Sequence, residues 1–116
     1  MPAPRRIEKL QNLLREEVTR IVNREIEFPE EMMVTVSRVS VSQDGLHANI
    51  FFTVLGGAEE DALAMLEKNV YDIQQLINRH LRMRPVPKIR FAIDEEEIKR
   101  QGVEKSLAEL KQKEEL

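Results

Sequence analysis

The sequence contains no cysteine and no tryptophan, and its aromatic side chains are one tyrosine and four phenylalanines in 116 residues. Without cysteine, the chain forms no disulfide, no thiolate metal site and no cysteine nucleophile, a composition that fits a reducing compartment. Because aromatic rings are scarce, the sequence argues against recognition of nucleic acid by base stacking. Recognition of shape or backbone is favoured instead.

Long apolar runs are also missing. No stretch reaches the roughly 18 consecutive apolar residues that a membrane-spanning helix needs. The N-terminal segment, MPAPRRIEKLQNLL, becomes polar too early for a secretory signal peptide. We therefore expect a cytoplasmic protein without a membrane partner. A length of 116 residues allows one domain with a two-layer core.

Groups for side-chain catalysis are sparse. The two histidines, His47 and His80, lie outside any metal-ligand motif, and Gly56–Gly57 lacks the flanking residues of a phosphate loop. The acidic run at 94–97 is more typical of a helix start than of a metal cluster. The sequence thus predicts a protein that is not an enzyme and has no metal ion, cofactor or small-molecule substrate.

Hydrophobic periodicity predicts the regular segments of the chain. They are an amphipathic helix from 5 to about 26, β-strands over 32–42, 46–54 and 88–93, and a helical segment from 58 to about 81 that is one long helix or two joined by a kink. The first two strands flank a turn and should form an antiparallel hairpin. The apolar phase of the first strand slips from even to odd positions, which predicts a β-bulge near Ser37–Arg38.

This order of segments, α-β-β-α(α)-β, predicts an α+β fold in which a three-stranded sheet packs against helices. We assign the folded domain to residues 1–94. Residues 95–116 are charged throughout and carry only a thin apolar stripe. We expect them to form a charged C-terminal helix or tail.

Charge is sorted along the chain, so the formal net charge of −3 hides local patches. Residues 25–67 hold nine acidic side chains and one basic side chain, whereas residues 68–90 hold six basic side chains and one acidic side chain. Lys88 and Arg90 alternate with apolar residues and therefore share one face of the third strand. Positive charge can thus gather on one surface of an acidic protein.

Cations from the helix end, the connector and the third strand can converge in one patch that suits a phosphate backbone. Arg79 and Arg82 lie three residues apart in the predicted helix and should share its face. The predicted RNA-binding residues are Arg79, Arg82, Arg84, Lys88 and Arg90, with Arg5, Arg6 and Lys9 extending the patch. The alternative is a basic helix end that complements the helix dipole and keeps the protein soluble.

Two motifs resemble one known family. The turn of the hairpin carries Ser42, Asp44, Leu46 and Ala48, which match a Ser-x-Asp-Leu and Ala pattern with Gly45 as an extra residue. The second motif runs from helix to strand and matches at Ile77, Leu81, Arg84, Pro87, Ile89, Phe91 and Asp94. Together they resemble ribosome-binding factor A, a bacterial assembly factor of the small ribosomal subunit, over roughly residues 5–95.

The resemblance implies a KH-like domain of type II topology, α-β-β-α-kink-α-β. The family has an Ala-x-Gly kink between the two later helices, and the matching positions here are Asn69, Val70 and Tyr71. The alanine and the glycine are both absent. Asparagine still tolerates unusual backbone angles, so we expect the kink at Asn69.

The resemblance also implies a function. It implies a monomer that binds the free 30S subunit or its precursor, contacts 16S rRNA, and promotes late 30S maturation and processing of the 16S rRNA 5′ end. The mechanism would be binding of one rRNA conformation in preference to another. Two other interpretations remain open: a KH-type RNA-binding protein with another target, and a protein–protein module whose basic patch meets an acidic partner.

Overall fold

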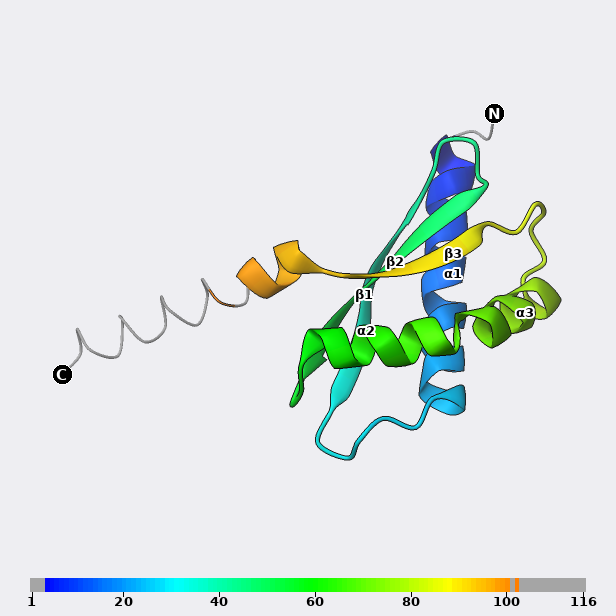
Figure 1. The fold of residues 1–116 in the computed structure, drawn as a ribbon. Coiled ribbons are helices and arrows are strands. Elements are labelled where there is room, and N and C mark those ends of the chain that lie inside the picture. The colour runs from blue at the N-terminus through cyan, green and yellow to red at the C-terminus, as the bar shows by residue number, and fades with distance from the viewer. Residues whose placement is uncertain (1–3, 101, 103–116) are drawn as a thin grey trace.

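The computed structural model describes residues 4–100 and 102 of the 116-residue chain. Figure 1 shows a twisted sheet whose hairpin runs alongside α1, with α2 and α3 crossing next to the third strand. The elements are α1 (Pro4–Glu25), β1 (Met33–Val41), β2 (His47–Leu55), α2 (Glu59–Lys68), α3 (Val70–His80) and β3 (Lys88–Ile93). The predicted α+β fold of a type II KH-like domain is confirmed.

The sheet has the order β1-β2-β3, so β2 is its central strand. β1 pairs with β2 in antiparallel register, and β3 pairs with β2 in parallel register. The register of the hairpin shifts between Val36 and Arg38, which leaves Ser37 without a cross-strand partner. The predicted β-bulge is therefore confirmed. It lets the apolar residues before and after it face the same core.

The helices cover one face of this sheet. α1 packs against β1 and α3, while α2 packs mainly against β3. Alternate strand residues point into the core that the helices close. The buried strand residues are Val39, Val41, Ala48, Ile50, Phe52, Ile89 and Phe91, and the helices add Leu14, Val18, Ile21, Leu66, Ile73 and Ile77. The described helices leave the opposite face of the sheet uncovered.

Two glutamines join the helices to the outer edges of the sheet. On the β1 edge, the Gln11 Oε1 atom of α1 accepts a hydrogen bond from the Val41 amide at 3.0 Å. On the β3 edge, the Gln74 Oε1 atom of α3 accepts from the Ile89 amide at 2.8 Å, and its Nε2 atom donates to the Pro87 carbonyl at 3.1 Å. Backbone groups that an edge strand leaves unpaired are thus satisfied by helix side chains.

The break between α2 and α3 falls at Asn69. Its φ of −104° and ψ of 3° depart from helical values, and its amide donates to the Leu66 carbonyl at 3.1 Å. The Asn69 side chain also donates to the Met65 carbonyl at 2.7 Å. Asparagine therefore ends one helix and begins the next without a glycine, because its side chain satisfies a carbonyl that the break exposes.

The end of α3 differs from the prediction. The helix ends at His80, and Leu81 adopts an extended conformation with φ −79° and ψ 126°. This conformation buries the Leu81 side chain. Arg82 consequently lies outside the helix, so the prediction that Arg79 and Arg82 share a helical face was wrong.

The C-terminal region begins as a helix. Residues 95–100 and 102 are helical. The rest of the predicted tail, 101 and 103–116, lies outside the described residues. Within the described part of the chain, no helix has both the length and the apolar character that crossing a membrane requires.

Gly56 should be intolerant of any side chain. Its φ is +77°, and a Cβ atom there would lie 1.9 Å from the Glu31 carbonyl oxygen. We expect Gly56→Ala to lower the free energy of unfolding by at least about 2 kcal/mol, measured by urea denaturation. Gly102→Ala is the matched control, since a Cβ there meets nothing within 4 Å. Equal stability of the two variants would contradict the strained turn.

Candidate nucleic-acid interface

The uncovered side of the sheet, called here the open face, carries polar and basic side chains. It consists of Arg38 and Ser40 of β1, His47, Asn49 and Phe51 of β2, and Lys88 and Arg90 of β3. These residues are exposed, apart from the partly buried Phe51. Their positions follow from the two-residue period of each strand. The alternation predicted for Lys88 and Arg90 is confirmed.

Cross-strand register sets the neighbours on the open face. Lys88 lies opposite His47, and Arg90 lies opposite Asn49. A shallow hollow of about 310 Å³ lies between β2 and β3, lined by these four residues with Ala48 and Ile89. Among the residues that the structure describes, neither Lys88 nor Arg90 forms an ion pair. Both cations therefore remain available to an anionic ligand.

Arg38 is engaged in contacts within the protein. Its guanidinium lies 4.0 Å from the centroid of the Phe51 ring, and its Nε atom lies 3.2 Å from the Asp94 carboxylate. Its Nη2 atom also lies 3.6 Å from the Glu96 carboxylate. The only aromatic ring of the open face is thus covered by a cation that two acids partly neutralise.

Arg84 has a structural role that the charge pattern did not predict. Its guanidinium donates to the carbonyls of Asn78 at 3.0 Å and Met83 at 3.1 Å, and also to the Leu81 carbonyl. These carbonyls lie at and just beyond the C-terminal end of α3. A cation there satisfies unpaired carbonyls and complements the helix dipole. Its donors are thus largely used inside the protein.

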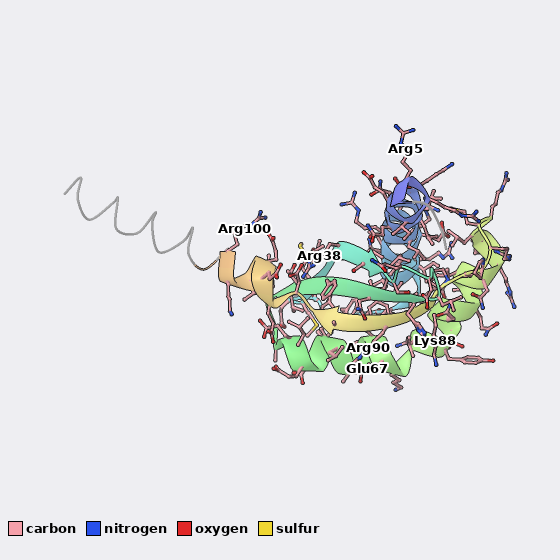
Figure 2. The ribbon with its side chains drawn as sticks, turned by 90° about the horizontal axis from the view of Figure 1, so that it is seen from above. Arg5, Arg38, Glu67, Lys88, Arg90 and Arg100 are labelled. Carbon is pink, nitrogen blue, oxygen red and sulfur yellow. The ribbon has the colours of Figure 1, made fainter. Side chains whose placement is uncertain are left out.

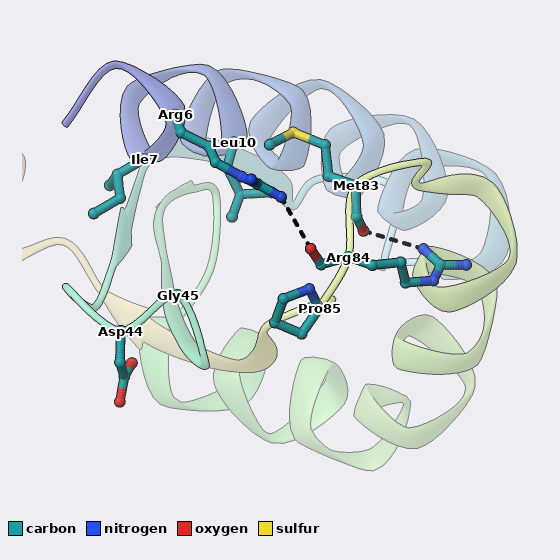
Figure 3. Close-up of a pocket in the computed structure, with 8 residues that line it drawn as sticks. All are labelled: Arg6, Ile7, Leu10, Asp44, Gly45, Met83, Arg84 and Pro85. Atoms are coloured by element: carbon teal, nitrogen blue, oxygen red, sulfur yellow. Dashed lines mark hydrogen bonds between the residues drawn. The ribbon is translucent and has the colours of Figure 1, made fainter. Parts of the chain in front are cut away.

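Arg6 also bonds within the protein. A cavity of about 350 Å³ opens where the start of α1, the β1–β2 turn and the α3–β3 connector meet. Figure 3 shows Arg6 reaching from α1 to the connector, where its Nη2 atom donates to the Arg84 carbonyl at 3.1 Å. The cavity is lined by Arg6, Ile7, Leu10, Asp44, Gly45, Met83, Arg84 and Pro85. The structure therefore brings Arg6 and Arg84 together.

The other predicted basic residues are exposed but do not form a single patch. Arg79 lies in the last turn of α3 and Arg82 lies in the connector, whereas Arg5 and Lys9 lie on the first turns of α1. In Figure 2, Arg5 lies at one border of the molecule and Lys88 and Arg90 lie across the strands from it. The cations thus form separate groups, since α1 packs against β1 while β3 forms the other edge of the sheet.

Sequence reasoning did not assign Ser40 and Asn49 to the interface. Asn49 occupies the centre of a cross-strand row, with Ser40 on one side and Arg90 on the other. The alternation of β2 was the available signal, because it places Asn49 on the same face as His47. Which β3 residue lies beside Asn49 follows only from the parallel register.

Asp94 is the one buried charged residue among those described, with 2% of its surface exposed. Its carboxylate accepts hydrogen bonds from the Ser37 hydroxyl at 2.5 Å, the Arg38 Nε at 3.2 Å and the Glu97 amide at 3.1 Å. Burial opposes its ionisation, but these bonds outweigh burial and hold the pKa of Asp94 below its usual value. Asp94 therefore caps the C-terminal helix as an anion.

No described group of three or more histidine, aspartate or glutamate side chains is arranged to hold a metal ion. The open face instead offers cations and an amide that can bind a ligand.

Comparison with known proteins assigns the chain to a family. A family model described as ribosome-binding factor A matches residues 6–107. The chain belongs to the ribosome-binding factor A family.

Individual relatives agree with this assignment. Ribosome-binding factor A of Natranaerobius thermophilus is 39% identical over 92 residues, which cover 78% of this chain and 70% of the relative. The crystal structure of the Thermus thermophilus factor superimposes with a TM-score of 0.66 at 24% identity, covering 75% of this chain and 94% of that one. Coordinates of the Thermus factor fitted into a cryo-EM map of a 30S complex give a TM-score of 0.63 at 24% identity, covering 72% and 90%.

The first motif that matches the ribosome-binding factor A family shapes the hairpin turn. The Asp44 carboxylate accepts from the Ser42 hydroxyl at 2.5 Å and from the Leu46 amide at 3.0 Å. The Ser42 oxygen accepts from the His47 amide at 3.1 Å. The Ser42 hydroxyl and the Leu46 amide together lower the pKa of Asp44. Gly45 completes the turn with a φ of +74°.

We expect Asp94→Asn to lower the free energy of unfolding by about 2 kcal/mol or more at pH 7. The substitution replaces a buried carboxylate, which accepts three hydrogen bonds, with a neutral amide that has one acceptor oxygen. The folded-state pKa lies below the unfolded value of about 3.9, so this stabilisation is present above that value. It is lost as the pH falls through the folded pKa. Urea unfolding from pH 7 to pH 3 should show the two proteins converging in acid. Glu95→Gln, at an exposed neighbour, is the control, and a constant difference at all pH values would contradict the assignment.

Arg84→Gln should cost about 1–2 kcal/mol of stability, because it removes the guanidinium that bonds the carbonyls at the end of α3. Arg82→Gln removes the same charge from the same connector without those bonds, and should change stability by less than about 0.5 kcal/mol. Urea unfolding of both variants tests the difference. If the two variants are equally stable, Arg84 does not cap α3.

Proposed function

We propose that this chain binds the free 30S small ribosomal subunit or its precursor and contacts 16S rRNA. Membership of the ribosome-binding factor A family carries the proposal. The 30S complex in which the Thermus thermophilus factor was fitted names the subunit. Exposed cations at the end of α3 and on β3 supply groups that suit a phosphate backbone.

The bound state would act on rRNA by selecting a conformation. The described residues offer cations and amides rather than a catalytic constellation, so the contribution of the protein is binding energy. A ligand shifts an equilibrium only by its difference in affinity for the two states. We infer that the protein holds the late 30S precursor in a form that favours final maturation, including processing of the 16S rRNA 5′ end.

The location, the oligomeric state and the contacting part of the chain complete the proposal. The factor would act in the cytoplasm as a monomer. Its rRNA contacts would come from the domain over 1–94, while Arg6 and Arg84 hold the connector in place. Residues 95–116 would form a charged extension that starts from the Asp94 cap. The cations proposed to meet rRNA are Arg5, Lys9, Arg79, Arg82, Lys88 and Arg90.

The full chain should co-sediment with free small subunits or their precursors in a sucrose gradient at low salt, and should not co-sediment with joined ribosomes. Raising the salt concentration should release it, because phosphate contacts weaken as counterions compete. Purified large subunits serve as the control. A protein that stays at the top of the gradient with small subunits and precursors present would overturn the proposed function.

A further inference from the structure

We propose that the open face, along β2 and β3, binds the phosphate backbone of an extended, single-stranded segment of RNA. The proposal rests on the proposed function and names the surface and the form of RNA that it takes. Four side chains carry it: His47 and Asn49 of β2, and Lys88 and Arg90 of β3. They belong to the centre and edge of the sheet rather than to a loop.

The open face is basic, because Arg38, Lys88 and Arg90 lie on it. No acidic side chain lies among the open-face residues, although the formal net charge of the whole chain is −3. Lys88 and Arg90 have no ion-pair partner within the described chain. By contrast, the exposed charged residues that flank the break at Asn69 between α2 and α3 are Glu67, Lys68 and Asp72, whose charges sum to −1. A polyanion is therefore attracted to the open face more than to the helix break.

The two cations of β3 are spaced to match successive phosphates. Lys88 and Arg90 are alternate residues of one strand, so their side chains leave the same face about 6.6 Å apart. That distance is close to the separation of successive phosphates in an extended RNA strand. Two neighbouring phosphates can thus each meet one cation while the strand runs along β3.

The neighbouring residues on β2 add hydrogen-bonding groups, and they determine which parts of the RNA this face can recognise. The Asn49 amide beside Arg90 offers a donor and an acceptor to a ribose or a base edge, and the hollow between the strands exposes it. The Phe51 ring is already covered by Arg38 at 4.0 Å, so no base stacks there without displacing that cation. Binding through this face should therefore tolerate many sequences.

The test measures the affinity of the full chain for a fluorescein-labelled oligouridine by anisotropy, as a function of salt. Lys88→Gln with Arg90→Gln should weaken binding about tenfold or more and lower the salt slope by about 1.4, the value for two phosphates of a single strand. Arg15→Gln with Arg24→Gln makes the same charge change on exposed positions of α1 and should leave affinity within about twofold. Circular dichroism checks that every variant is folded.

The outcomes separate this proposal from the proposed function. Suppose that the wild type binds small subunits, and that the Lys88/Arg90 variant binds both oligouridine and small subunits with the affinity of the wild type. The open-face proposal alone then fails. The open-face proposal also fails if an RNA duplex competes with the labelled oligouridine as effectively as an unlabelled single strand does. It fails as well if the wild type does not bind oligouridine, even when the Lys88/Arg90 variant no longer binds small subunits. That last result would assign the surface to structured rRNA or to a ribosomal protein. Failure of the wild type to bind small subunits would overturn the proposed function itself.

Discussion

The buried carboxylate of Asp94 fixes three parts of the chain against one another. A nearly inaccessible anion is tolerated only when its oxygens are hydrogen-bonded, and here the donors come from the bulge of β1 and the first turn of the C-terminal helix. The Asp94 amide also donates to the Phe52 carbonyl at 2.8 Å, which continues the β2–β3 pairing by one residue. Ser37 reaches the carboxylate because the bulge frees it from strand pairing. The bulge therefore has two effects. It keeps the apolar residues of β1 facing the core, and it brings the Ser37 hydroxyl to the Asp94 carboxylate at the end of β3, two strands away.

The sequence predicted those features that depend on local periodicity. The alternation of β3 gave its bounds and both of its faces, and the phase slip in β1 placed the bulge near Ser37–Arg38. Features that depend on which distant backbone group lies nearby were not predictable. Arg84 was placed correctly in the connector, yet nothing in a run of basic residues reveals that its guanidinium meets the carbonyls at the end of α3. The end of α3 before Arg82 was missed for a related reason, since burial of Leu81 outweighs local helical preference.

Separation of the basic residues has a physical basis in the fold. A run that is continuous in sequence, from Arg79 to Arg90, crosses a helix end, a connector and a strand, and each directs its side chains differently. Arg84 bonds the protein's own carbonyls, whereas Lys88 and Arg90 face solvent and have no ion-pair partner among the described residues. Charge density along a chain therefore overestimates the charge that one ligand meets. The sheet, by contrast, places two of these cations, Lys88 and Arg90, on one face, where register aligns Lys88 with His47 and Arg90 with Asn49.

The glutamine contacts at the two sheet edges limit how this protein can associate with others. An edge strand with unpaired amides is a template for a further strand, either from a partner or from a second copy that begins an aggregate. Here Gln11 occupies the Val41 amide and Gln74 occupies the Ile89 amide, so at these points an incoming strand would have to displace a helix side chain. Growth of the sheet by strand addition is thereby discouraged at both borders. A partner that leaves these two contacts in place would therefore meet the side chains of the sheet rather than its backbone amides at Val41 and Ile89.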